Sequence, residues 1–310
     1  MKEKRYLVLL FLTCFSITAQ IKGFVVDDKN QPIPYVNIWL ENENIGTTSN
    51  EDGTFNIDAN ADTVLVFSAV GYESLKTKVA AGQNVVLQIA VQQLKEVFVR
   101  TRTEKEKIEI NKYNNKEITS FHFANNRPTI IAKYIQNSAV IEEHPFLKKI
   151  TFLSNCQTPT AKIKIRFYNV AVDGNPGEDY STDHVIVSVK KGKRSVTIDL
   201  SDKNISIPKE GLFLAFEWMI IDENKYTYNY TFDSNNVKQI GALYDPKKKI
   251  YTDGQDYQPY IGTVRSDEFS TWHFIGGKWN KIIKRPENSN SKNRYTGNTG
   301  DLAVKLTLTN

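Results

Sequence analysis

The sequence has few cysteines and no long apolar segment beyond its first residues. Only two cysteines occur, Cys14 and Cys156, and Cys14 lies in a segment that we expect to be removed. A chain left with one cysteine cannot form an internal disulfide, even in an oxidising compartment. Cys156 is therefore expected to be a small buried hydrophobic residue. No later run approaches the roughly 18 apolar residues of a membrane-spanning helix, so none is predicted.

The chain also lacks a strong charge imbalance and the common catalytic motifs. Its net charge is +5, and removing residues 1–19 deletes three basic residues and Glu3, leaving 5 − 3 + 1 = +3. This small excess is spread along the chain, which argues against a nucleic-acid partner. His122, His144, His184 and His273 do not have zinc-site spacing. Hydrolase serine and phosphate-loop motifs are also missing, so we predict no catalytic residue, metal or cofactor.

The first 19 residues have the layout of a secretory signal peptide. A basic start at residues 2–5 precedes an apolar run at 6–15, and mostly small residues follow up to Ala19. The run is too short to cross a bilayer as a helix. We expect cleavage after Ala19 and export to the periplasm or the outer-membrane surface. A retained anchor and lipid attachment at Cys14 are the alternatives.

The segment after the leader is patterned as closely spaced strands with turn residues between them. Alternating or continuous apolar residues predict strands at 24–26, 36–40, 45–48, 54–57, 63–68 and 85–89. Gly53 ends a polar turn, where a positive φ suits glycine. Short strands at this spacing indicate a small β-sandwich.

Five spaced blocks of residues carry a family resemblance. They are Gly23-x-Val25-x-Asp27, Pro32 with Val36, Gly46-Thr47-x-Ser49-Asn50, Gly53-x-Phe55 and Ser68-x-x-Gly71-Tyr72. Residues 21–92 thereby resemble the carboxypeptidase regulatory-like domain, a transthyretin-like sandwich of about seven strands. Ser49 and Asn50 stand where that family more often has Thr and Asp.

The resemblance implies an accessory module without catalytic residues of its own. In bacterial envelope proteins such a domain often precedes an outer-membrane receptor barrel. Leu94–Val99 resembles the segment near the energy-coupling box of TonB-dependent receptors, although a last strand entering a linker is the alternative. The 210 residues after Arg100 are too few for a barrel of about 22 strands, which needs over about 400 residues.

Four regions are predicted in all: a signal peptide at 1–19, the regulatory-like sandwich at 20–92, a charged linker at 93–119 and a second domain at 120–310. Strands in the second domain are expected at 129–135, 149–153, 162–168, 184–189, 195–200, 212–221, 271–275, 279–283 and 302–308. This pattern, with a turn predicted at Lys191-Gly192, suggests a jelly-roll-like antiparallel β-sandwich, so the whole chain is expected to be all-β. A small outer-membrane barrel of about eight to ten strands is the alternative, disfavoured because several short strands carry charge on both sides.

Two groups of residues in the second domain are candidates, one for a buried ion pair and one for a ligand-binding surface. Glu217 lies in the apolar run 212–219, and Arg166 is its expected structural partner, with a catalytic acid as the alternative. Tyr226, Tyr228 and Tyr230 alternate on one strand face. Flat rings beside amides suit sugar stacking. A ligand platform is predicted from Tyr251, Tyr257, Tyr260, Trp272 and Trp279.

The function expected from these features is non-enzymatic binding or scaffolding in the cell envelope. The partner would be an envelope protein or a glycan. Lectin-like glycan binding by residues 120–310 is the first alternative. A sandwich-type hydrolase is the second, and it would need two carboxylates about 5 to 9.5 Å apart in a groove.

Overall fold

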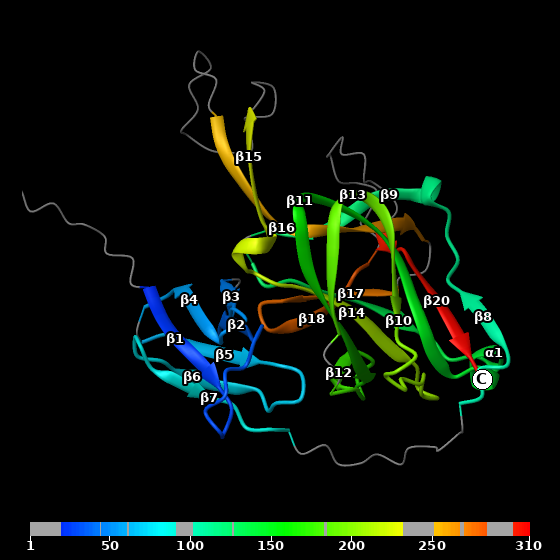
Figure 1. Cartoon of the computed structure of the whole chain (residues 1–310), viewed down its shortest axis with the longest axis horizontal. Coiled ribbons are helices and arrows are strands. Elements are labelled where there is room, and N and C mark those ends of the chain that lie inside the picture. The colour runs from blue at the N-terminus through cyan, green and yellow to red at the C-terminus, as the bar shows by residue number, and fades with distance from the viewer. Residues whose placement is uncertain are drawn as a thin grey trace, which may run out of the picture.

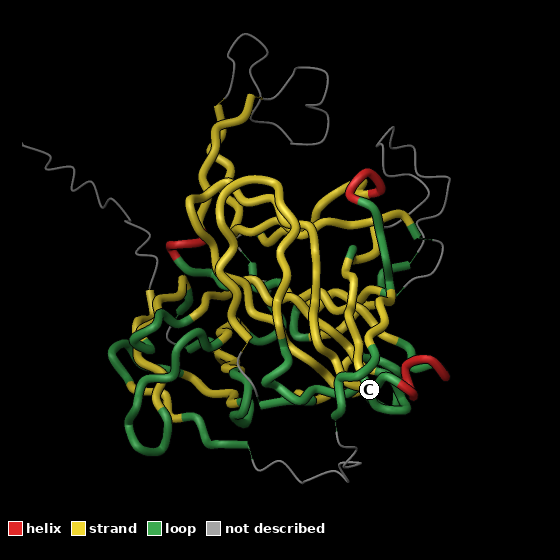
Figure 2. Tube along the Cα trace, turned by 45° about the vertical axis from the view of Figure 1, so that its right-hand side comes forward, coloured by secondary structure: helices red, strands yellow, loops and turns green. Residues whose placement is uncertain are grey.

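The computed structural model describes residues 20–43, 45–60, 62–90, 102–125, 127–182, 185–231, 251–266, 270–283 and 300–310 (Figure 1). Strands dominate this part of the chain, and its helices are short (Figure 2). The predicted signal peptide, the 94–99 segment and His184 lie outside the described residues. Within them, no helix has the length and apolar character needed to cross a membrane.

The N-terminal part is a seven-stranded β-sandwich, as the sequence predicts. Its strands are β1 (Gln20–Val26), β2 (Asn37–Leu40), β3 (Gly46–Thr48), β4 (Thr54–Asp58), β5 (Val64–Ser68), β6 (Leu75–Lys78) and β7 (Asn84–Val86). One sheet has the order β4-β1-β7, in which β1 and β7 are parallel. The other has the order β3-β2-β5-β6. We call this unit the N-terminal sandwich.

Its core follows from the period-two pattern of the strands. In β4, Phe55 and Ile57 are buried while the polar residues between and beside them are more exposed. Phe55 packs edge-on against Phe67 of the opposite sheet, with ring centroids 5.6 Å apart. The strand β6 has no matching apolar run, since it lies at a sheet edge with every second residue exposed. That exposure explains why the sequence pattern did not indicate it.

The rest of the described chain forms a second antiparallel β-sandwich, the C-terminal sandwich. Its strands are β8 (Lys107–Ile110), β9 (Ile118–Ala124), β10 (Ile130–Ile135), β11 (Phe146–Val170), β12 (Pro176–Asp179), β13 (Val185–Asp199), β14 (Leu212–Trp218), β15 (Lys225–Thr231), β16 (Tyr251–Arg265), β17 (Thr271–Ile275), β18 (Lys278–Lys281), β19 (Gly300–Leu302) and β20 (Val304–Thr309). The helical segments are η1 (Asn115–Glu117), α1 (Ala139–Glu143) and η2 (Asp222–Asn224).

The long strand β11 joins the layers of the C-terminal sandwich. Its first half pairs with β20, and its second half pairs with β14, while β13 follows it along most of its length. The main path of the sheet is β15-β16-β11-β14-β10-β17-β18, with β9 and β19 on β16. Apolar residues from both halves of β11, together with β14 and β20, form one continuous core.

Four sequence predictions differ from the structure here. The strands expected at 149–153 and 162–168 are one strand, β11, and those expected at 184–189 and 195–200 are one strand, β13. Gly192, which was predicted to lie in a turn, lies instead within β13. It pairs with Cys156 of β11 where the register between these two strands shifts, and its φ is +101°. A β-bulge needs the same glycine conformation as a turn, so the two look alike in sequence. The linker expected at 93–119 is in part a strand of the C-terminal sandwich, because β8 pairs with β20.

The hairpin of β15 and β16 extends away from the body of the C-terminal sandwich (Figure 1). Its base continues into the sheet, where β16 pairs with β9 on one side and with β11 and β19 on the other. The outer face of this hairpin is therefore continuous with the outer face of β9, β16 and β11.

Candidate functional site

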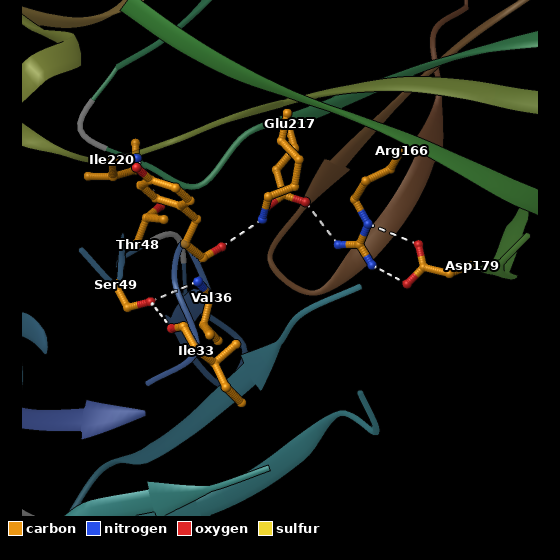
Figure 3. A network of polar contacts seen from close by, with 10 residues as sticks. Ile33, Val36, Thr48, Ser49, Arg166, Asp179, Glu217 and Ile220 are labelled. Atoms are coloured by element: carbon orange, nitrogen blue, oxygen red, sulfur yellow. Dashed lines mark hydrogen bonds and ion pairs between the residues drawn. The ribbon is translucent and has the colours of Figure 1, made fainter. Parts of the chain in front are cut away.

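The two sandwiches meet over a buried network of charged groups (Figure 3). Glu217 of β14 accepts hydrogen bonds from Lys164 Nζ at 3.0 Å and from Arg166 Nη1 at 2.8 Å. Arg166 also donates to both carboxylate oxygens of Asp179, at 3.0 and 2.5 Å. Glu217 is only 1% exposed. The Arg166–Glu217 pair is thus present, and Lys164 and Asp179 extend it.

Strand register explains why these groups meet. Lys164 lies directly opposite Glu217 in the β11–β14 pair, and Arg166 lies two residues further along β11. Both positions are within reach of one side chain on an antiparallel pair. The alternation of Lys162, Lys164 and Arg166 along β11 is the sequence signal that could have identified Lys164 as a second partner.

The charges around Glu217 settle its protonation state. Burial alone would raise the pKa of this carboxyl group, but the neighbouring Lys164 and Arg166 outweigh burial and lower the pKa below its ordinary value. Glu217 is therefore ionised at neutral pH and has no proton to donate. Its geometry supports the structural pair and not the alternative of a catalytic acid.

Tyr35 attaches the N-terminal sandwich to this network. Its carbonyl oxygen accepts a 2.6 Å hydrogen bond from Lys164 Nζ, and its hydroxyl oxygen accepts one of 3.0 Å from Lys162 Nζ. Its ring packs in a small apolar cluster with Met219 and Ile221. Tyr35 has φ +57°, an uncommon conformation for a residue with a large side chain. Tyr35 follows Pro34 in a turn, so this uncommon backbone conformation belongs to the loop that presents Tyr35 to the C-terminal sandwich.

Two further contacts fix the position of the N-terminal sandwich. The backbone N–H of Ile220 donates to Thr48 Oγ1 at 2.9 Å (Figure 3). The ring of Trp39 on β2 meets Phe274 on β17 edge-on, with centroids 5.8 Å apart. Apolar, polar and charged groups therefore all contribute to this interface, which favours a defined orientation of the two sandwiches.

The five predicted platform residues do not form one surface. Tyr257 is 7% exposed and belongs to the central core. Trp272 is 6% exposed and packs with Phe213 in a separate cluster, against which Trp279 also packs. The side chain of Tyr251 lies outside the described part of the structure. The platform prediction was wrong as a set, because neighbouring positions on a strand point to opposite faces.

Tyr260, the remaining member of that prediction, belongs to a different aromatic surface. Five rings of β9, β15 and β16, of which Phe123 is exposed and the other four are half-buried, make up what we call the aromatic face: Phe121, Phe123, Tyr226, Tyr228 and Tyr260. Phe123 is 44% exposed, and its ring centroid lies 5.3 Å from that of Tyr260. Tyr226 and Tyr228 have centroids 5.8 Å apart and planes inclined by only 26°.

Polar groups connect the rings of the aromatic face. Asp256 pairs with Tyr226 across the hairpin, and its Oδ2 accepts a 2.7 Å hydrogen bond from the Tyr260 hydroxyl. Burial, this bond to Asp256 and the nearby Tyr228 all act to raise the pKa of Tyr260. Tyr260 is therefore a neutral hydroxyl at physiological pH. Apolar rings with polar edges are the surface chemistry that stacks against sugars.

The interior of the C-terminal sandwich holds an unusual pair of histidines. His122 of β9 and His273 of β17 have ring centroids 5.1 Å apart, and the Nε2 atom of each is buried without a hydrogen-bond partner among the described residues. Burial lowers the pKa of His122 to about 3 and also lowers that of His273. Nearby, Asp301 accepts hydrogen bonds from Lys133, Ser270 and Thr271.

This cluster is not a metal centre of the usual kind. In the described segments no three His, Cys, Asp or Glu side chains are grouped so that they could hold a metal ion. Asp301 is already occupied by Lys133 and two hydroxyl groups, which leaves two neutral imidazoles facing each other. We therefore assign this cluster a role in the core of the sandwich.

Comparison with protein families identifies the N-terminal sandwich. The model of the CarboxypepD_reg-like domain matches residues 21–99. The N-terminal sandwich is a carboxypeptidase regulatory-like domain. This result agrees with the resemblance carried by the motif residues and leaves the C-terminal sandwich unassigned.

Two comparisons with individual proteins gave matches of different extent. The TonB-dependent receptor SusC of Bacteroides thetaiotaomicron is 30% identical over 92 residues, which is 30% of this chain and 9% of the receptor. A solved structure from Bacteroides uniformis, of a protein to which carbohydrate binding has been ascribed, covers 80% of this chain and 99% of its own. Its identity is 10% and its TM-score 0.17, too low to inform fold or function.

The motif residues of the carboxypeptidase regulatory-like domain have structural tasks. Ser49 Oγ accepts a 2.8 Å hydrogen bond from the Val36 N–H and donates one of 3.1 Å to the Ile33 carbonyl (Figure 3). These two bonds hold the segment that carries Tyr35. Serine here supplies the hydroxyl group that the family's more frequent threonine would supply, so the departure at Ser49 preserves the interaction.

Proposed function

We propose that this chain is an exported, non-enzymatic binding protein of the cell envelope. In this proposal the carboxypeptidase regulatory-like domain is the docking unit toward an envelope partner, and the C-terminal sandwich binds a carbohydrate through the aromatic face. The observation that carries the proposal is the near-parallel, 5.8 Å pairing of Tyr226 and Tyr228 on the outer side of the hairpin. Because these two rings stack on one another, they are held rigidly, and their outward faces and polar edges can contact a ligand at low entropic cost.

The envelope location is supported by the leader-like first 19 residues and by the partial match to a TonB-dependent receptor. Because the chain spans only 9% of that receptor, none of the receptor's own activity is transferred. Expression in a Gram-negative host, followed by fractionation and N-terminal sequencing, tests the location. We expect a chain that begins at Gln20 in the envelope fraction. A cytosolic chain that still begins at Met1 would overturn the proposal of export.

Interdomain contacts support the docking role. Tyr35, Thr48 and Trp39 tie the regulatory-like domain to the C-terminal sandwich, so that a partner bound to one unit would hold the other in a set orientation. A flexible pair of domains would not give the aromatic face a fixed direction relative to the partner.

Affinity electrophoresis of the purified chain in gels that contain soluble polysaccharides tests carbohydrate binding. We expect retardation by at least one polysaccharide, and about tenfold weaker binding in the Tyr226→Ala/Tyr228→Ala variant, because each lost ring removes roughly 0.5 to 1.5 kcal/mol of stacking. The matched control is Phe24→Ala, which removes a 46% exposed ring from the N-terminal sandwich and should not alter binding. Unchanged migration in every gel would refute the carbohydrate role.

A further inference from the structure

A cluster of cations lies in the middle of β13, at the register shift opposite Cys156 and Thr160. It contains four exposed basic residues within five positions, which we call the basic bulge: Lys190, Lys191, Lys193 and Arg194. Within the described residues, no ion pair involves any of the four, although Arg194 donates to the backbone carbonyl of Lys191. Like charges so close together repel one another, so an anion bound here would relieve an existing electrostatic strain.

The basic bulge borders the aromatic face through Lys193. Lys193 pairs with Asn155 of β11, and Asn155 pairs with Tyr260 of β16, so these three residues lie side by side across three strands. The ammonium group of Lys193 lies 5.7 Å from the centroid of the Phe121 ring. With neighbouring strands about 4.8 Å apart, Lys193 and Tyr260 are separated by roughly 10 Å at the backbone, a span that two sugar units can bridge.

We propose that the ligand of the aromatic face is an acidic polysaccharide, whose carboxylate or sulfate groups bind the basic bulge while its sugar rings stack on Tyr260 and the rings beside it. This inference rests on the proposed carbohydrate role and names its ligand class. Asn155 lies between the cation and the ring, where an amide can bond sugar hydroxyls. Among the described side chains we place one acid on this face, Asp256, which is 5% exposed and accepts a hydrogen bond from the Tyr260 hydroxyl, so it opposes an anionic ligand only weakly.

The position of the charges favours an acidic glycan over a single-stranded nucleic acid. A nucleic acid carries a phosphate at every unit, and proteins that bind it follow its backbone with cations along the whole row of rings. Here the cations are gathered at the Phe121 end, and at the other end Tyr226 pairs with Asp256. A polymer with occasional or one-sided acidic groups matches this distribution.

The test compares polygalacturonate, neutral dextran, polyphosphate and oligo-dT as ligands of the full chain by isothermal titration calorimetry and affinity electrophoresis. We expect polygalacturonate to bind best and Lys193→Gln/Arg194→Gln to weaken its binding about three- to tenfold, because this variant loses the charge contact of Lys193 and the nearby charge of Arg194. Raising the ionic strength from about 0.05 M to about 0.5 M should weaken it further, since the Debye length then falls to a few ångströms.

The matched control is Lys29→Gln/Lys78→Gln, which removes the same charge from exposed positions of the N-terminal sandwich and should leave binding unchanged. Dextran binding as tight as that of polygalacturonate, insensitive to Lys193→Gln/Arg194→Gln, would overturn this inference while the carbohydrate role stands. Equal or tighter binding of polyphosphate or oligo-dT would overturn the inference too. If no polysaccharide binds and Tyr226→Ala/Tyr228→Ala changes nothing, the carbohydrate role itself fails.

Discussion

Lys164 Nζ donates a 2.6 Å hydrogen bond to the carbonyl oxygen of Tyr35, and this bond joins the core of one sandwich to a loop of the other. The same ammonium group pairs with Glu217 at 3.0 Å. One buried cation therefore neutralises an acid of the C-terminal sandwich and holds the strained residue through which the regulatory-like domain docks. Folding of the C-terminal sandwich and docking of its neighbour depend on the same group.

Replacing Lys164 by methionine should destabilise the chain by about 2 to 3 kcal/mol in urea unfolding. Breaking a buried pair by removing one partner typically costs about 3 to 5 kcal/mol, and Arg166 remains here to neutralise Glu217 in part. The control Lys76→Met breaks the exposed pair with Glu41 and should cost less than about 1 kcal/mol. Equal effects of the two substitutions would show that the buried network contributes no more than a surface pair.

Ser49→Ala should destabilise the regulatory-like domain by about 1 to 3 kcal/mol. The substitution leaves the buried Val36 N–H and Ile33 carbonyl without their shared partner. Ser49→Thr keeps the hydroxyl group and should restore most of the stability, measured by thermal unfolding. If the threonine variant loses as much stability as the alanine variant, the size of the side chain at position 49, and not its hydrogen bonds, determines the stability of the domain.

Gly53→Ala should be more destabilising than Gly82→Ala, although both glycines have similar positive φ values of +77° and +81°. A Cβ atom at Gly53 would lie 2.6 Å from the Val25 carbonyl oxygen, whereas nothing lies within 4 Å of one at Gly82. Backbone strain of about 1 to 2 kcal/mol is common to both variants. The difference between their unfolding free energies measures the clash, and equal values would contradict it.

Stability should fall as the pH decreases below about 6.5 because of His122. Its folded-state pKa, about 3, lies below the ordinary value of 6.5 because burial disfavours the charged ring. The unfolded state therefore binds the proton first, and the stability that the neutral ring provides above pH 6.5 is lost progressively toward pH 3. At pH 5 this loss is about 2 kcal/mol relative to neutral pH.

Urea unfolding at pH 7 and pH 5 checks this prediction against the His122→Phe variant, whose stability should change less between the two values. His273→Phe is an independent variant, because burial lowers the pKa of His273 as well and its loss should also flatten the profile. A pH dependence identical in the natural chain and in both variants would show that neither histidine carries the effect.

Local patterns in the sequence were sufficient for the strands of the regulatory-like domain except β6. Glycine at 53, alternation in Val36–Leu40 and the continuous run at 63–68 each reflect short-range rules of turns and strands, and the structure places β2, β4 and β5 there. The same rules failed at Lys191-Gly192, where β13 continues past a register shift against β11 and Gly192 has the positive φ that a turn would use.

Which side chains meet was decided only by the tertiary structure. Sequence patterns alone indicated the all-β class and the family of the N-terminal sandwich. They also predicted that Glu217 pairs with a cation, because an acid inside an apolar strand requires a positively charged partner. Period-two alternation places Tyr257 and Tyr260, three residues apart on β16, on opposite faces of the sheet, but it could not tell which face is buried in the core. Which face is buried depends on the pairing of β16 with strands such as β9, whose residues lie more than a hundred positions away in the sequence.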